Sequence, residues 1–399
     1  FDVLMAASER DEDLLVRGLD ELWRRHIVRE QGGTAYDFSH DKIREVAYAE
    51  ISAAQRRLLH RRVAQALEQI YAPDLDPVSG QIATHYERAG MPAQAVPYYQ
   101  RAAEVVQRVY ANQEAIDLLT RGLALLEKLP DSPARDEQEL ALQTALGFSL
   151  IALKGYGASE VRAAFARAQA LCQRLGQPPS PPVLRAMAIA FVARGEIREA
   201  HALGEQLLEI ARSADDPILY TEAHYVLGVT LFWLGQFAPA HAHLEQAIVY
   251  YDAQRHRIHT ALYGQDPGVV CLSRLALNLW YLGYPNQAVQ RGQEALMLAQ
   301  ELSHPLSFAY ALNYVAWIAN ERRDRQKTRE LTERVMTLSS EQQLGWWPPT
   351  GSVLQGWVLA EQGQVEAGIA QMYQGLTEHQ ATNQRLHLPY LLSLLAHTY

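Results

Sequence analysis

A repeat of about 40 residues runs through most of the chain and limits the folds open to it. Glycines recur after apolar, aromatic-rich stretches, and a small residue follows each of them five positions later. The pairs are Gly195 with Ala200, Gly235 with Ala240, Gly283 with Ala288 and Gly363 with Gly368, and Arg323 with Thr328 fills the same places in a further copy. Similarity at this period is typical of helix pairs that bury their apolar faces only against neighbouring pairs. We expect a stack of such pairs.

The first 72 residues follow a different pattern. Asp11 supplies a helix start, Gln31–Gly33 a turn, Tyr36–Phe38 an alternating extended segment, and Ser52 a helix cap. A hairpin set among short helices is typical of a winged-helix domain. Prolines from Pro73 onward mark the change of pattern.

The fold class predicted from these patterns is all-α. We expect a right-handed superhelix of antiparallel, tetratricopeptide-like helix pairs, preceded by a small winged-helix domain. The predicted domains are the winged helix over 1–72, first repeats over 79–176, and regular repeats over 183–399 with the last unit truncated. The truncation, and a start at Phe1 without methionine, suggest a fragment.

Composition narrows the partners and the compartment. The formal net charge is -9 and charged residues make up 20% of the chain, so nothing attracts it globally to nucleic acid or to anionic membranes. Cys172 and Cys271 stand alone in helical contexts, which favours a reducing compartment. No apolar run reaches the roughly 20 residues that span a bilayer. We expect a cytoplasmic protein that touches neither a membrane nor, through this part, nucleic acid.

Two stretches carry a family resemblance. Phe38–Tyr48 (FSHDKIREVAY), followed by Arg56–Ala64 (RRLLHRRVA), resembles the winged helix that follows the nucleotide-binding module of STAND-class signalling ATPases. Gly228–Gly235 and Tyr263–Val269 resemble the tetratricopeptide half of large bacterial regulators that join such ATPases to cyclase, kinase or DNA-binding output domains. The resemblance covers essentially the whole chain.

The resemblance implies a nucleotide-sensing role for one residue. In the class, a winged-helix histidine senses the β-phosphate of bound ADP, and His40 matches that position. The alternative is that His40 is a helix-cap histidine packed by the wing. The sequence lacks the Gly-x-x-x-x-Gly-Lys-Ser/Thr loop that cradles a triphosphate. ATP or ADP is therefore expected in the full-length parent, and no cofactor in this part. It also lacks the usual hydrolase and metalloprotease motifs, so we assign no catalytic residue and no enzyme activity.

Aromatic residues on the first helices of the repeats form a candidate binding groove. First helices line the concave side of tetratricopeptide stacks, and aromatic rings with polar tips suit a peptide, a helix or a small apolar ligand. The alternative is that these side chains are core, because units longer than 34 residues have extended helices. The candidates are Tyr225, Phe232, Trp233, Trp280, Tyr281, Tyr310, Asn313, Trp317 and Trp357.

The unit of 48 residues contains an insertion, Gln254–Gly268, that is a second candidate. Insertions into repeats often shape the binding surface. Recognition of an anion or a partner would use Arg255, Arg257, Tyr263 and Asp266; the alternative is a loop packed on itself. A metal site is not expected, since the two arginines would repel a cation.

The resemblance, together with the repeats, implies a ligand- or protein-binding sensor module of a multidomain bacterial signal-transducing ATPase, such as a transcriptional regulator or a nucleotidyl cyclase fusion. Its expected partners are a protein, a peptide or a small-molecule effector in the groove, and its own ATPase domain. One alternative is a constitutive scaffold for protein assembly. Another is the regulatory portion of a protein whose main activity is an upstream cyclase or kinase.

Overall fold

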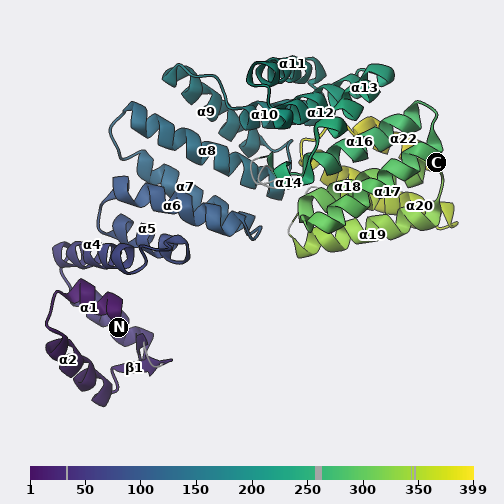
Figure 1. Ribbon diagram of the computed structural model, residues 1–399. Helices are drawn as coiled ribbons and strands as arrows, with labels where there is room; N and C mark the ends of the chain where they lie inside the picture. Colours follow the sequence, from purple (N-terminus) through teal and green to yellow (C-terminus); the bar gives the residue numbers. More distant parts are fainter. Residues whose placement is uncertain (33–34, 257–262, 343, 346) are drawn as a thin grey trace. The chain divides into compact units, whose positions relative to one another are not determined.

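The backbone confirms the all-α prediction. The computed structural model describes residues 1–32, 35–256, 263–342, 344–345 and 347–399, which are almost entirely helical (Figure 1). They form two compact units, Phe1–Leu142 and Gln143–Tyr399. These units are larger groupings than the three predicted domains, whose boundaries remain predictions.

The start of the first unit contains the expected hairpin among helices. Its strands pair antiparallel, with Val28 opposite Phe38. The Asp11 side chain accepts from the Asp13 amide at 3.0 Å, and the Ser52 hydroxyl accepts from the Gln55 amide at 3.3 Å, so both predicted helix starts are present. The elements are α1 (Asp2–Ser8), α2 (Glu12–Arg24), β1 (Val28–Gln31), β2 (Ala35–Phe38), α3 (Asp41–Glu50) and α4 (Ala53–Ile70).

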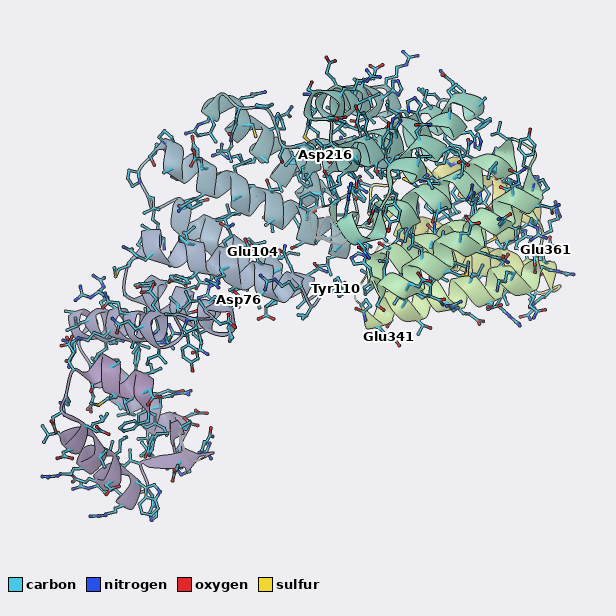
Figure 2. All side chains as sticks on the ribbon, viewed as in Figure 1. Asp76, Glu104, Tyr110, Asp216, Glu341 and Glu361 are labelled. Carbon is cyan, nitrogen blue, oxygen red and sulfur yellow. The ribbon has the colours of Figure 1, made fainter. Side chains whose placement is uncertain are left out.

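Helices packed in sequence order complete the first unit. They are the short 3-10 turn η1 (Asp76–Val78), α5 (Ser79–Arg88), α6 (Pro92–Gln107), α7 (Asn112–Leu126) and the first part of α8 (Pro133–Lys154). Ile82 and Tyr99 are fully buried between them. Asp76, labelled in Figure 2, accepts from Arg101 at 2.6 Å and from Arg108 at 2.7 Å. These hydrogen bonds lower the pKa of Asp76 and tie η1 to α6.

The second unit contains the regular repeats. Helices joined by short turns pack side by side, as in α12 with α13 and α20 with α21. The unit holds the rest of α8, α9 (Ser159–Leu175), α10 (Pro181–Arg194), α11 (Ile197–Ala214), α12 (Pro217–Trp233), α13 (Phe237–Tyr250), α14 (Ala253–His256), α16 (Pro267–Tyr281), α17 (Pro285–Leu302), α18 (Pro305–Glu321), α19 (Arg325–Glu341), α20 (Pro348–Glu361), α21 (Val365–Ala381) and α22 (Leu388–Thr398). Five of the first helices, α10, α12, α16, α18 and α20, begin with proline, which suits a position where no amide donor is needed.

The repeated glycine ends the first helix of each pair in a left-handed conformation. The φ angles are 84° at Gly195, 76° at Gly235, 86° at Gly283 and 88° at Gly363. Such angles cost an L-residue about 1 to 2 kcal/mol, which explains the glycines. Arg323 adopts φ 54° at the same place. The further copy of the repeat therefore keeps the turn without its glycine.

Small residues let paired helices approach closely. Ala200, Ala240 and Ala288 have no exposed surface. A Cβ atom added at Gly356 would lie 2.6 Å from the carbonyl oxygen of Gly368, on the partner helix. The backbones of α20 and α21 therefore touch without intervening side chains.

Candidate functional site

The first helices of the second unit share an inner side, across which another part of the chain lies. We call the residues Ala193, Trp233, Arg274, Tyr310, Tyr314 and Trp317 the inner wall; they come from α10, α12, α16 and α18. We call Thr382–His387, which joins α21 to α22, the inner segment. The amides of Arg385 and Leu386 donate to the carbonyl of Ala193 at 2.9 and 3.3 Å. The inner segment therefore binds α10 through its backbone.

The next side chains of the segment pack on the wall. The His387 ring lies edge-on to Trp317, with centroids 5.2 Å apart, and tilted to Trp233 at 5.9 Å. The Tyr314 hydroxyl lies 3.4 Å from His387 Nε2. Burial, followed by the charge of Arg274, holds the pKa of His387 well below its usual range. The imidazole is neutral at pH 7 and serves as an aromatic contact.

Most of the predicted groove residues are buried by the chain itself. Tyr225, Phe232, Tyr310, Asn313, Trp317 and Trp357 are each at most 7% exposed. Trp233 and Trp280 are partly exposed, and Tyr281 is 42% exposed. Burial is what the core alternative predicts. The role of these residues as a binding groove remains a prediction.

Ring contacts connect several of the predicted groove residues. Trp233 and Trp317 meet with centroids 6.4 Å apart. Phe232 packs edge-on against both Trp233, at 5.1 Å, and Tyr281, at 5.5 Å. The hydroxyls of Tyr225 and Tyr310 lie 3.3 Å apart. A separate core beneath α22 holds Trp357, together with Val353, Met372, Leu391 and Leu395.

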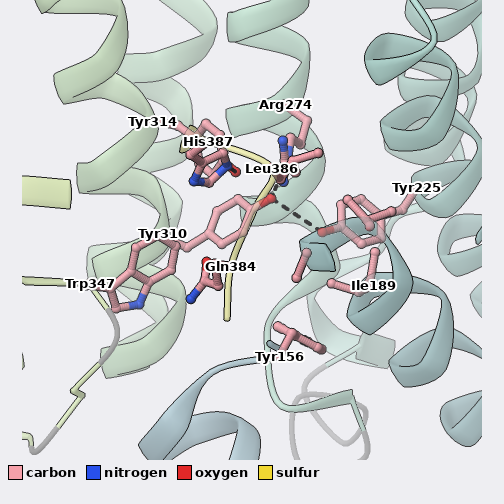
Figure 3. A pocket seen from close by; sticks show the side chains of 12 residues that line it. Tyr156, Ile189, Tyr225, Arg274, Tyr310, Tyr314, Trp347, Gln384, Leu386 and His387 are labelled. Atoms are coloured by element: carbon pink, nitrogen blue, oxygen red, sulfur yellow. Dashed lines mark hydrogen bonds between the residues drawn. The ribbon is translucent and has the colours of Figure 1, made fainter. Parts of the chain in front are cut away.

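A small cavity lies between the inner wall and the inner segment (Figure 3). Its volume, counted as the space open to the centre of a water molecule, is about 30 Å³. One water molecule needs roughly 10 to 15 Å³ by the same measure, so the cavity admits a group of only a few atoms. Its lining is Tyr156, Ile189, Val192, Ala193, Tyr225, Arg274, Tyr310, Tyr314, Trp347, Gln384, Leu386 and His387.

Arg274 is the permanent charge that lines this cavity. Its Nε donates to the Tyr310 hydroxyl at 2.5 Å, and its guanidinium lies 4.3 Å from the centroid of the Tyr314 ring. Only 6% of the residue is exposed. Among the described residues no carboxylate lies within ion-pair distance of it, and its Nη1 has no hydrogen-bond partner. The sequence carried a signal for this residue, an arginine inside the apolar run Val269–Leu279, which the groove prediction did not use.

A second buried arginine lies behind the wall and does have a carboxylate partner. Arg185 donates through Nε to Glu222 at 3.1 Å and through Nη1 to the Tyr156 hydroxyl at 2.6 Å. Burial raises the pKa of the Glu222 carboxyl to about 7, against the opposing charge of Arg185. Arg185 Nη1 also donates to the Tyr263 carbonyl at 3.1 Å. This contact fixes the end of the insertion to α10.

The insertion residues divide between the interior and the surface. Tyr263 and Asp266 are buried. The Asp266 carboxylate caps α16 by accepting from the Val269 amide at 2.9 Å, and also accepts from the Tyr251 hydroxyl at 3.1 Å. Arg255 is exposed, whereas Arg257 lies outside the described residues. Recognition of an anion or a partner by this insertion remains a prediction. Among its described candidate residues, Arg255 is the one whose side chain is exposed to a partner.

His40 stands at the start of α3 on the surface of the first unit. Its side chain makes no cap hydrogen bond and is exposed. Its backbone carbonyl accepts from the Ile43 amide at 3.0 Å. The nucleotide-sensing role of His40 remains a prediction. Elsewhere among the described residues, no group of three His, Cys, Asp or Glu side chains could hold a metal ion, and no helix is long and apolar enough to cross a membrane.

No known protein family matches the chain by its sequence model. An uncharacterised protein of Rhizobium meliloti is 24% identical over 351 residues, which are 88% of this chain and 34% of the relative. The chain therefore spans about a third of the length of that relative.

Solved structures resemble the chain in fold. A Rap protein, solved in complex with competence and sporulation factor, matches with a TM-score of 0.54 and 11% identity, over 87% of this chain and 99% of its own. A signal-transduction ATPase with numerous domains from Pyrococcus horikoshii, which has a tetratricopeptide repeat sensor, has a TM-score of 0.40 and 14% identity, over 100% of this chain and 63% of its own. At such identities the likeness concerns the fold alone. The chain is built of tetratricopeptide-like helical repeats.

Proposed function

We propose that the chain is the ligand- or protein-binding sensor of a multidomain bacterial signalling ATPase, and that the inner wall recognises a peptide segment. The observation that carries this proposal is the inner segment itself. A non-helical stretch lies across four first helices, held by two backbone hydrogen bonds to Ala193 and by the ring of His387 against Trp317. A surface that holds one polypeptide segment in this way has the chemistry to hold another.

Binding at this wall would act as a switch if a partner replaced the inner segment. The segment leads directly into α22, so its release would free α22 from α18 as well. A ligand shifts such an equilibrium only by the difference between its affinities for the two states. The contacts of the inner segment set the free energy that a partner peptide must exceed. The Rap protein of similar fold was solved in complex with competence and sporulation factor, which agrees with a ligand-binding role for this fold here.

The larger protein is proposed from the sequence resemblance. In it, ATP or ADP would bind a nucleotide module outside this chain, and His40, exposed at the start of α3, would sense the nucleotide. The relative from Rhizobium meliloti is about three times as long as its matched part, which leaves room for such modules. The output would be a cyclase, a kinase or a DNA-binding domain.

A constitutive scaffold is the second candidate. The burial of Tyr225, Tyr310 and Trp317 beneath the chain's own residues favours it, because a wall that stays covered leaves only outer surfaces for partners. In that case the inner segment is a structural part of the fold. The sensor function requires that a bound partner releases the inner segment from the wall, whereas the scaffold function requires that the inner segment stays in place.

The experiment uses residues 1–399 and a library of displayed peptides, and selected peptides are then synthesised for fluorescence anisotropy. Tyr390→Ala weakens the hold on the inner segment, so it should bind a selected peptide more tightly than the parent. Trp233→Ala, partly exposed on the wall, should bind it more weakly. Tyr284→Ala, exposed and away from the wall, is the matched control. Peptides that bind all four proteins equally, or a library that yields none, would contradict the proposal.

A further inference from the structure

Arg274 is a buried cation that the described protein leaves without a counterion. Guanidinium groups stay protonated at any physiological pH, and buried charges in proteins are normally paired. Burial raises the pKa of Tyr310 and raises that of Tyr314 to about 12, so neither phenol supplies a negative charge. The fully buried carboxylate of Glu222 pairs with a different arginine, Arg185. The environment of Arg274 therefore favours an anion.

The cavity beside Arg274 has the other features of a binding site for a small anion. Arg274 Nη1 and Gln384 Nε2 are buried donors without partners, and both residues line the cavity (Figure 3). The Tyr310 hydroxyl, which accepts from Arg274 Nε, also lines it. Buried donors without partners and one positive charge match a planar group that carries one negative charge.

The rest of the lining is aromatic and aliphatic. Ile189, Val192 and Leu386 contribute aliphatic surface to the same cavity. An ion with several charges would lack cations to neutralise it, because Arg274 is the one arginine and no lysine appears among the described residues that line the space. The small free volume excludes ligands with more than a few heavy atoms. Charge, donors and volume together indicate a short aliphatic acid.

We propose that this cavity binds a short-chain monocarboxylate such as propionate, with its carboxylate on Arg274 and its alkyl group against Ile189, Val192 and Leu386. The inference deepens the proposed sensor function and rests on it, since it names a chemical group that the inner wall would recognise. Gln384 and Leu386 belong to the inner segment, so a bound carboxylate bridges the segment to α16. Propionate therefore holds the inner segment against the wall.

The test measures binding of propionate to residues 1–399 by isothermal titration calorimetry and by thermal unfolding, with sodium chloride replaced at constant ionic strength. Propionate should raise the melting temperature in proportion to the logarithm of its concentration, as mass action requires. Propionamide has nearly the same shape without the charge and should have no effect. Arg274→Met should lower the affinity for propionate by roughly 10- to 100-fold, the value of hydrogen bonds to a charged group.

Two variants keep the test decisive. Arg291→Met removes an arginine on α17 that pairs with Glu294, away from the cavity, and should bind propionate as the parent does. Tyr310→Phe removes one hydroxyl and tests the site if Arg274→Met fails to fold; it should weaken binding. The proposal is overturned if propionamide equals propionate, if the Arg274 and Tyr310 variants keep the full response, or if phosphate binds more tightly.

The propionate test and the peptide test can succeed or fail independently of each other. Selected peptides that depend on Trp233, together with no response to propionate, would remove the carboxylate site and leave the sensor proposal intact. A propionate response that depends on Arg274, with no selected peptide, would remove peptide recognition alone.

Discussion

The ring of Tyr390, on α22, stacks on the ring of Trp317, on α18, with centroids 4.0 Å apart and planes within 14°. The Tyr390 hydroxyl also donates to the Asn320 side chain at 2.5 Å. These contacts join the last described helix to the inner wall. The aromatic residue that sequence analysis placed in an open groove is thus a contact within the chain.

The first prediction concerns this pair. Trp317→Ala should lower the free energy of unfolding by about 3 to 5 kcal/mol, because it removes a buried aromatic side chain. With Tyr390→Ala it should show a coupling energy of about 0.5 to 1.5 kcal/mol in a double-mutant cycle. Urea unfolding followed by circular dichroism measures both. Tyr284→Ala, at a residue 53% exposed, should change stability by less than about 0.5 kcal/mol. Strict additivity would show that the stacking carries no energy.

The second prediction concerns two glycines of α20. Gly356→Ala would place a Cβ atom 2.6 Å from the Gly368 carbonyl, so the helices must separate, at a cost of about 1 to 3 kcal/mol. The Cβ atom of Gly351→Ala would lie 3.5 Å from the Met336 side chain and 4.0 Å from the Thr332 carbonyl oxygen, which are ordinary contacts. That variant should be neutral or stabilising by up to about 1 kcal/mol, through helix propensity. Thermal unfolding of the two variants compares them, and equal effects would refute the close backbone contact.

The third prediction concerns the turn at Arg323. Its φ of 54° lies in the left-handed region, where glycine is preferred. Arg323→Gly should therefore stabilise the second unit by about 0.5 to 1 kcal/mol, because relief of the left-handed strain exceeds the entropy that glycine adds to the unfolded chain. Gly363→Ala, the reverse change at the equivalent turn with φ 88°, should destabilise it by about 1 to 2 kcal/mol. Chemical denaturation of both variants tests the pair, and a loss of stability in Arg323→Gly would mean that the arginine side chain makes a stabilising contact.

The fourth prediction concerns acid stability. Burial lowers the pKa of His304 and of His379 to about 4, below the ordinary value of 6.5. Between these values the unfolded chain binds more protons than the folded one, so stability falls as the pH drops from about 6.5 toward 4. Each histidine contributes at most about 1.4 kcal/mol per pH unit.

The same prediction has a residue-specific check. His304 Nδ1 accepts from the Ser307 amide at 3.2 Å and so caps α18 in the unprotonated form. His304→Asn keeps a capping acceptor but cannot titrate. Its free energy of unfolding should depend less on pH between 7 and 5 than that of the parent. An unchanged slope would assign the acid sensitivity to other groups.

Local patterns predicted the elements of this fold well. The register of glycines located the helix pairs, and it located Arg323 correctly although that copy has no glycine, because the apolar spacing of the helices fixed the frame. The caps at Asp11 and Ser52 were readable since they depend on neighbours within three residues. A winged-helix identity for residues 1–72 remains a prediction.

Contacts between distant residues were not predictable in this way. The hydrogen bonds from Arg385 and Leu386 to Ala193 join residues nearly 200 positions apart, and no periodicity records them. The same holds for the burial of Trp317 by Tyr390. Arg274 was missed for another reason. A lone arginine in an apolar helix is visible in the sequence, but whether it has a carboxylate partner depends on helices that only the structure places around it.

The link between Ala193 and Leu386 changes the mechanics that a stack of repeats would otherwise have. An array with free ends can fray one helix pair at a time, because each pair depends only on its neighbours. Here a late segment is fastened to an early helix, so peeling away α22 also breaks bonds at α10. The second unit should consequently melt as one cooperative body. A substitution that loosens the turn before α22 should therefore also destabilise α10.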